Sequence, residues 1–270
     1  YQIVFAITAF GALVLAGSVL FKKAKERTSF ETMYGILSLS IAIWAIGRFQ
    51  LLFSETQQDA LFWIHALYNG SSLVYVFFLH TILIFLDSNQ KRKSILIFFY
   101  ITSFISFFLN NLDWITGSQY FIQSAIPKMR FSFYEEAGSI HLLHIFNSLV
   151  IPLYALIEMS RFLRRFTGDK LQQLRFIIFS SILGFFGGNS VLFLLYNIQI
   201  EPFLLILVPF HVVTLAYAVT KHHLFNIRVI ATEFLVFVIW ISLLARVFIA
   251  ETVQEFAAGA GLGEALGEAF

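Results

Sequence analysis

The chain has 270 residues, of which 59% are hydrophobic and only 13% are charged, and its mean hydropathy is +0.80. This small number of charged residues cannot cover a water-exposed surface of this size. The composition therefore excludes an ordinary soluble domain and indicates a membrane protein. The net charge of +2 gives no reason to expect a nucleic-acid partner, and the absence of cysteine excludes disulfides and thiolate metal ligands.

Seven apolar segments alternate with loops along the chain. A helix needs about 20 mostly apolar residues to cross a bilayer, because its backbone polar groups must be satisfied within the segment. The predicted spans are residues 1–21, 30–53, 61–86, 94–109, 140–160, 176–196 and 203–219. An eighth apolar run, residues 234–250, either spans or lies at the interface. Strict alternation of apolar and polar residues is almost absent, so we predict an all-α bundle of seven transmembrane helices with a possible eighth, and no β-barrel.

Basic residues are concentrated in every second loop, which indicates the orientation of the chain. Fourteen of the 18 lie in the first, third and fifth loops and after the seventh span: Lys22, Lys23, Lys25, Arg27, Lys91, Arg92, Lys93, Arg161, Arg164, Arg165, Lys170, Arg175, Lys221 and Arg228. Short basic loops are retained on the cytoplasmic side. We therefore expect the amino terminus outside and the end of the seventh span inside.

The longest loop, residues 110–139, is aromatic and lies outside in this orientation. After residues 120–126 and a turn at Pro127 and Lys128, side chains alternate with a period of two: Met129, Arg130, Phe131, Ser132, Phe133 and Tyr134. This pattern predicts a β-hairpin or cap over the outer mouth of the bundle. The alternative is an aromatic belt at the interface with no pocket beneath it.

Polar side chains inside a bilayer are costly and are therefore candidates for function. Ten residues with polar or aromatic side chains gather by depth in the outer half of the bundle, and we predict that they bind a ligand: Trp44, Arg48, His65, Tyr68, Asn69, His141, His144, Asn147, Asn189 and Tyr196. His141 and His144 share one helix face and could hold a metal or an anion beside Arg48. We expect neither a metal nor a cofactor, because zinc would require further ligands. Polar packing between helices is the alternative for the histidines, and snorkelling to water is the alternative for Arg48.

Other classes of membrane protein find little support in the sequence. His80 and His211 lie deeper in the third and seventh spans, where a bis-histidine haem is conceivable. A retinal protein needs a lysine within the membrane, and the seventh span has none. A transporter or channel would place ionisable groups near the midplane, which is almost empty of carboxylates.

Three features of the sequence belong together: Trp44, the sequence Phe78-Leu79-His80, and residues 216–229, which read AYAVTKHHLFNIRV. They resemble the amino-terminal seven-helix sensor region of bacterial membrane histidine kinases. Helix exits of that family have a similar form, a Tyr-Ala-Ile followed by basic residues and Leu-Phe-Asp-Ile. Val219 and Asn226 replace the usual Ile and Asp here.

The resemblance implies a sensor domain over residues 1–229 that detects a small-molecule or peptide ligand and has no enzymatic activity of its own. It also implies multi-pass insertion in the bacterial inner membrane, contact with lipid, a cytoplasmic kinase output and a homodimer. The output signal would leave through Tyr217, Lys221, His222, Phe225, Asn226 and Arg228. Residues 230–256 contain the extra apolar run, residues 257–270 form a Gly/Ala-rich tail, and no pattern typical of a kinase core follows Val229. A structural or accessory subunit of a larger membrane assembly is the alternative function.

Overall fold

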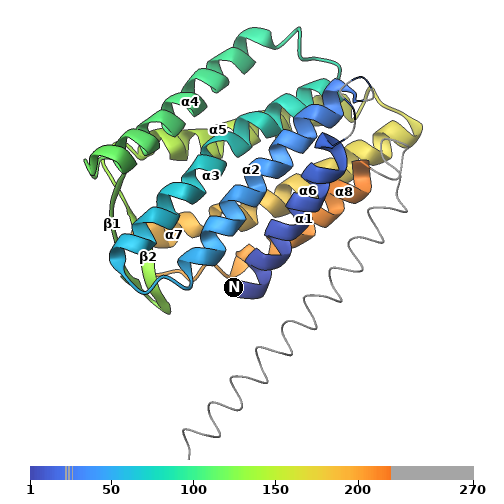
Figure 1. Cartoon of the computed structure of the whole chain (residues 1–270). Coiled ribbons are helices and arrows are strands. Elements are labelled where there is room, and N and C mark those ends of the chain that lie inside the picture. Colours follow the sequence, from blue (N-terminus) through green and yellow to red (C-terminus); the bar gives the residue numbers. More distant parts are fainter. Residues whose placement is uncertain (22, 24, 26, 220–270) are drawn as a thin grey trace, which may run out of the picture. The chain divides into compact units, whose positions relative to one another are not determined.

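The computed structural model describes residues 1–21, 23, 25 and 27–219 (Figure 1). All of them belong to one compact unit, Tyr1–Phe225. The element order is α1 (Gln2–Leu20), α2 (Ser29–Leu51), α3 (Gln57–Phe85), α4 (Lys93–Thr116), β1 (Ile122–Lys128), β2 (Phe131–Ala137), α5 (Leu142–Phe162), α6 (Gly168–Asn189), α7 (Val191–Leu195), the 3-10 helix η2 (Phe203–Ile206) and α8 (Leu207–Val219). Within the described residues, six helices are long and apolar enough to cross a membrane, with Gly168–Leu195 counted as one, and a shorter apolar helix follows.

Helix α4 shows how the bundle is built for lipid. Its outward face is apolar and each of the following side chains is at least 45% exposed: Ile97, Phe98, Ile101, Phe104, Ile105 and Phe108. The spacing of three and four residues places them along one side of the helix. The opposite face buries Ser103, Ser106, Asn110 and Asp113. Polar groups inside and apolar groups outside suit a helix whose surroundings are hydrocarbon.

Helices α2 and α3 approach closely because glycines lie between them. A Cβ added at Gly47 would lie 2.6 Å from Leu67 Cβ, and one added at Gly70 would lie 2.4 Å from the backbone oxygen of Ser40. Small residues allow such close backbone contact in membrane bundles. The pair α2–α3 therefore forms a closely packed centre against which α1, α4 and α5 pack.

The two ends of the bundle differ in charge and in structure. The hairpin β1–β2 and the amino terminus lie at one end (Figure 1), where the rings of Tyr1 and Phe131 are 5.2 Å apart. The other end holds the basic connections from α3 to α4 and from α5 to α6. These two connections lie close together there, because the ring centroids of Phe85 and Phe166 are 6.2 Å apart and Arg92 lies 3.2 Å from Glu158. This segregation agrees with the alternation of basic loops in the sequence.

The predicted helical bundle is confirmed, with one small two-stranded sheet added to it. Several boundaries differ from the prediction, and two helices begin early: α3 at Gln57, where residue 61 was predicted, and α6 at Gly168, where residue 176 was predicted. Helix α4 continues to Thr116, so Asn110 and Asp113 are helical; the sixth span divides at Ser190, whose hydroxyl donates to Gly187 O at 2.6 Å; and the seventh begins as a 3-10 turn. The run 234–250 and the tail 257–270 lie outside the described residues.

Candidate functional site

A β-hairpin covers the amino-terminal end of the bundle, as the alternating sequence predicts. Strands β1 and β2 are antiparallel, with Ala125 opposite Glu135 and Ile126 opposite Tyr134. The start of the hairpin is held by Asp113 of α4, whose carboxylate accepts hydrogen bonds from the backbone N–H of Tyr120 and of Ile122 at 2.8 and 3.0 Å. The hairpin is therefore tied to the end of α4, and its inner residues pack on α3 and α7.

The centre of this end is a buried ion pair between helix and hairpin. Arg48 of α2 donates from both terminal nitrogens to the two carboxylate oxygens of Glu135, with Nη1 to Oε2 at 2.8 Å. The Arg48 side chain is 4% exposed and that of Glu135 is fully buried. The ring of Tyr134 lies 5.3 Å from the guanidinium carbon. Snorkelling of Arg48 to water is therefore wrong, because a hairpin carboxylate supplies its counter-charge inside the protein.

Lys128 ties the same hairpin to α7. Its Nζ donates to the backbone oxygens of Leu194 and Leu195 at 3.1 and 3.2 Å and to that of Glu135 at 3.1 Å. The carbonyls of Leu194 and Leu195 end α7, where a positive charge is favoured by the helix dipole. Burial lowers the pKa of Lys128, and the nearby carboxylates of Glu136 and Glu135 oppose that shift. The hairpin thus holds α2 through Glu135 and α7 through Lys128.

The histidine pair lies behind the hairpin in an aromatic cluster. The rings of His141 and His144 are 5.2 Å apart, and Tyr68 packs edge-on against both, at 5.2 and 5.0 Å. His141 Nδ1 lies 3.2 Å from the hydroxyl of Tyr196. No group of three or more metal-binding side chains occurs among the described residues. The pair is packed as part of the core, where His141 has Tyr196 as its partner and His144 lies 3.5 Å from the Ser106 hydroxyl.

His65 and Asn69 face α4 instead of the histidine pair. His65 Nδ1 lies 3.0 Å from Asn110 Oδ1, and Asn110 Nδ2 donates to both His65 O and Asn69 Oδ1 at 3.0 Å. Asn147 of α5 likewise accepts from Thr102 of α4 at 2.8 Å. These three predicted ligand residues are used in helix contacts, which is the alternative that the sequence left open.

His65 also borders a crevice of about 300 Å3 between α3, α4 and the start of β1. Its other walls include Phe62, Trp114 and Gln123. Asp113 lies at its edge, but the carboxylate oxygens already accept the hydrogen bonds that hold the hairpin. The crevice is therefore a second concave surface at the hairpin end, built mainly from aromatic and amide side chains.

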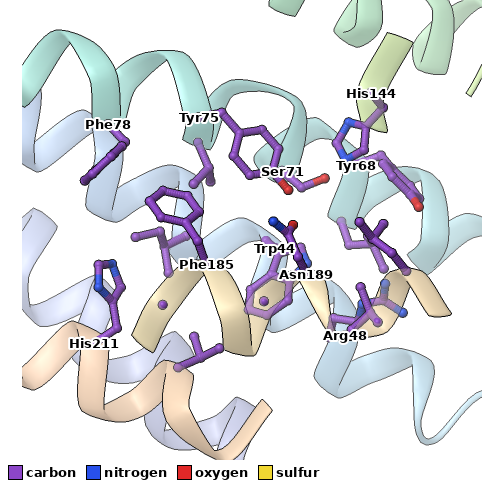
Figure 2. A pocket seen from close by; sticks show the side chains of 18 of the residues that line it. Trp44, Arg48, Tyr68, Ser71, Tyr75, Phe78, His144, Phe185, Asn189 and His211 are labelled. Carbon is purple, nitrogen blue, oxygen red and sulfur yellow. The ribbon is translucent and has the colours of Figure 1, made fainter. Parts of the chain in front are cut away.

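A cavity of about 80 Å3 lies between α2, α3, α5, α6, α7 and α8. Figure 2 shows Arg48 and Tyr68 at one end and Phe78 and His211 at the other. Five of the ten predicted ligand residues line it: Trp44, Arg48, Tyr68, His144 and Asn189. The other five, His65, Asn69, His141, Asn147 and Tyr196, do not.

Further lining residues escaped the sequence analysis, notably Ser71, Tyr75, Phe185 and Gly188. Ser71 and Tyr75 follow Tyr68 at intervals of three and four residues, so the helical period of α3 was a usable signal for them. Phe185 and Gly188 carry no such signal, because they look like ordinary apolar span residues. Glu135 was not predicted, because it lies in the loop of residues 110–139 and the candidates were chosen from the predicted spans.

The two deeper histidines have separate partners. His80 Nδ1 lies 2.7 Å from the hydroxyl of Tyr100. His211 Nδ1 lies 2.9 Å from Ser180 Oγ, and the same hydroxyl donates to His211 O at 2.9 Å. Since each histidine is paired with a different helix, the structure does not bring them together for a haem.

Of the six predicted output residues, one lies among the described residues. Tyr217 lies in α8, and Lys221, His222, Phe225, Asn226 and Arg228 lie outside the described residues. What the structure does place is the start of α8, since Val208 and His211 both line the cavity.

Comparison with known families gives a match over most of the chain. The family described as the N-terminal 7TM region of histidine kinase matches residues 4–228, which include the described helices except for the first two residues of α1. No curated protein and no solved structure matches the chain. The chain therefore belongs to the family of N-terminal seven-transmembrane regions of histidine kinases.

Proposed function

We propose that this region detects a ligand in the cavity and passes a change of helix packing through α8 to a cytoplasmic output. One observation carries the proposal: the cavity is lined both by Arg48, which holds the hairpin, and by Val208 and His211 of α8. The family implies association with the cytoplasmic region of a histidine kinase. A ligand in the cavity would thus contact the element that leads toward that region.

The contact between α6 and α8 offers a route for such a change. The ring of His211 lies so close to α6 that a Cβ at Gly184 would be 2.5 Å from His211 Cγ. His211 is also hydrogen-bonded to Ser180 in both directions. A ligand that contacts His211 and Phe185 from the cavity side would alter this spacing. A receptor requires two such packing states that bind the ligand unequally.

The test fills the cavity and measures kinase output. Gly188 lines the cavity, and a Cβ added there meets no atom within 4 Å, so Gly188→Leu should fold with the cavity occupied by its own side chain. In the full-length kinase in its native membrane, this variant should stop responding to growth conditions that change phosphorylation in the wild type. The control is Phe186→Leu on the same helix, where the side chain is 66% exposed to lipid. Equal responses of Gly188→Leu and wild type at equal abundance contradict sensing in this cavity.

A second test separates the sensor from a structural subunit. Inserting one residue between Thr220 and Lys221 would rotate everything beyond it by about 100° in a continuous helix. In a sensor, output should lock on or off while protein abundance stays constant. In a structural or accessory subunit, the insertion should act only through assembly or stability.

We further propose an inner-membrane location with the amino terminus outside, and a homodimer. The chain has no cysteine, so single cysteines can be introduced for labelling. Cysteines at Glu55 and Ser118 should react with an impermeant reagent from outside, and one at Arg164 should react only after lysis. Labelling of Arg164→Cys in intact cells would contradict this orientation and indicate the opposite one. Cross-linking of the full-length kinase in membranes tests the dimer.

A further inference from the structure

Two basic connections meet at the end of the bundle opposite the hairpin (Figure 1). They are residues 86–93, which lead from α3 to α4, and residues 158–170, which lead from the last turn of α5 into α6. Together these residues include seven Lys or Arg and only three Asp or Glu. The ends of a membrane bundle lie at the level of the lipid headgroups. The basic end therefore presents an excess of positive charge to phosphate groups.

A buried carboxylate positions two of these basic side chains. Glu158 of α5 is 1% exposed, and its Oε1 lies 2.5 Å from Arg161 Nη1 and 3.2 Å from Arg92 Nη2. The ends of the two arginines are close together, because both contact the same oxygen atom. A single carboxylate cannot neutralise two guanidinium groups, so the three side chains keep one positive charge in excess.

Both arginines remain open to a further partner. The side chains of Arg92 and Arg161 are 37% and 54% exposed. A guanidinium has five N–H donors, so contact with one carboxylate oxygen leaves donors free on each arginine. Its forked donors match the oxygens of a phosphate group, which a lysine binds only as a point charge. The two arginines thus offer free donors and an uncompensated charge in one place.

The apolar surface next to Arg161 indicates that the phosphate belongs to a lipid. Leu149, Leu153 and Ile157 of α5 are exposed, and they precede Arg161 at intervals of four residues. Side chains four residues apart are neighbours on one side of a helix. An exposed apolar stripe on α5 therefore ends at the arginine that faces the headgroups.

Helix α4 repeats this arrangement from its own basic end. Ile97, Ile101 and Ile105 are exposed and follow Lys93, the residue after Arg92, at intervals of four residues. A basic group at the end of an apolar stripe matches a phospholipid, in which a phosphate is joined to hydrocarbon chains. A soluble acidic segment of a protein would use the charge and leave the stripes unused. The pattern on both helices favours lipid.

We propose that Arg92 and Arg161 form a clamp for the phosphate of an anionic phospholipid, whose acyl chains lie along the apolar stripes of α4 and α5. Glu158 holds the two guanidinium groups in place. The headgroup of phosphatidylcholine carries a cation that the excess positive charge repels, whereas that of phosphatidylglycerol carries none. The proposal goes beyond ligand sensing and is independent of it, because no residue of the clamp lines the cavity.

Four probes test the class on the 270-residue chain in neutral detergent micelles. Phosphatidylglycerol is the anionic lipid, phosphatidylcholine with the same chains is the neutral one, and inorganic phosphate and hexaglutamate are soluble anions. Binding is measured as lipid retained in native mass spectrometry and as the rise of melting temperature with probe concentration. Phosphatidylglycerol should bind about tenfold more tightly than phosphatidylcholine, and the two soluble anions should not stabilise the chain.

Single variants locate the phosphate contact. Arg161→Gln and Arg92→Gln should each lower the affinity for phosphatidylglycerol about fivefold and leave that for phosphatidylcholine unchanged. Each variant leaves Glu158 paired with the other arginine, so both should fold, and the melting temperature in phosphatidylcholine checks this. Arg175→Gln is the matched control, because it removes the same charge from an exposed residue of α6 that forms no ion pair with Glu158. It should change the affinity about twofold or less.

Three results would overturn the proposal. Equal binding of the two lipids in the wild type would leave the three side chains as a fastening between α4 and α5 only. Binding of phosphate or hexaglutamate as tight as that of phosphatidylglycerol would indicate a soluble anion or an acidic protein segment as the partner. Equal losses in Arg175→Gln and Arg161→Gln would indicate diffuse attraction by the whole basic end, without a clamp.

Discussion

Removing the charge of Glu135 should detach the hairpin from the bundle. In Glu135→Gln the guanidinium of Arg48 stays buried at 4% exposure without its carboxylate. Loss of one partner of a buried ion pair costs about 3–5 kcal/mol, because the remaining charge is left uncompensated. At 1.4 kcal/mol per factor of ten, hairpin opening should become roughly a hundred to several thousand times more populated. Limited proteolysis between residues 120 and 138 and unfolding in mixed micelles measure the two effects.

The neighbouring carboxylate provides the control. Glu136 is only partly buried and accepts from Ser124 Oγ at 2.5 Å, so Glu136→Gln should cost about 1 kcal/mol or less. The double variant Arg48→Met/Glu135→Leu should recover most of the lost stability, since an apolar pair can replace a buried ion pair at little cost. If Glu135→Gln and Glu136→Gln have the same effect, or if the double variant is less stable than either single one, the reasoning from the buried pair is refuted.

Three further outcomes are expected. Gly70→Ala should destabilise the bundle by about 3 kcal/mol or more, because the new methyl would meet the α2 backbone at 2.4 Å. Gly188→Ala should be neutral or gain up to about 1 kcal/mol from helix propensity. Equal melting temperatures of the two variants would contradict the close packing of α2 and α3. Lys128→Met should cost about 1–3 kcal/mol by leaving the carbonyls at the end of α7 unpaired, and unchanged hydrogen exchange there would contradict the cap. Asp113→Asn should loosen the start of the hairpin by about 1–2 kcal/mol, seen as faster proteolysis after α4, because the amide has a single oxygen and can accept from only one of the backbone N–H groups of Tyr120 and Ile122.

The helices could be predicted from the sequence because a bilayer imposes a simple condition. A span must be long, apolar and internally hydrogen-bonded, and the chain meets that condition segment by segment. The hairpin was also predictable, since strand periodicity and a turn are local signals. Helix ends were less certain: α4 extends to Thr116 because Asn110 and Asp113 find polar partners on α3 and on the hairpin, which no local pattern announces.

The candidate site could be predicted only in part. Five residues chosen by depth in the membrane line one cavity, namely Trp44, Arg48, Tyr68, His144 and Asn189, but depth does not specify which way a side chain points. His65 and Asn69 have the same depth and turn toward α4.

The sequence by itself determined the membrane environment, the number of apolar segments, the segregation of basic loops and the family, because each depends on composition and order along the chain. The tertiary structure alone decided the partner of Arg48, since Glu135 is 87 residues away and only the fold of the hairpin brings the two charges together. It also decided that a cavity exists between six helices, because a cavity depends on how side chains of distant segments fill the space between them.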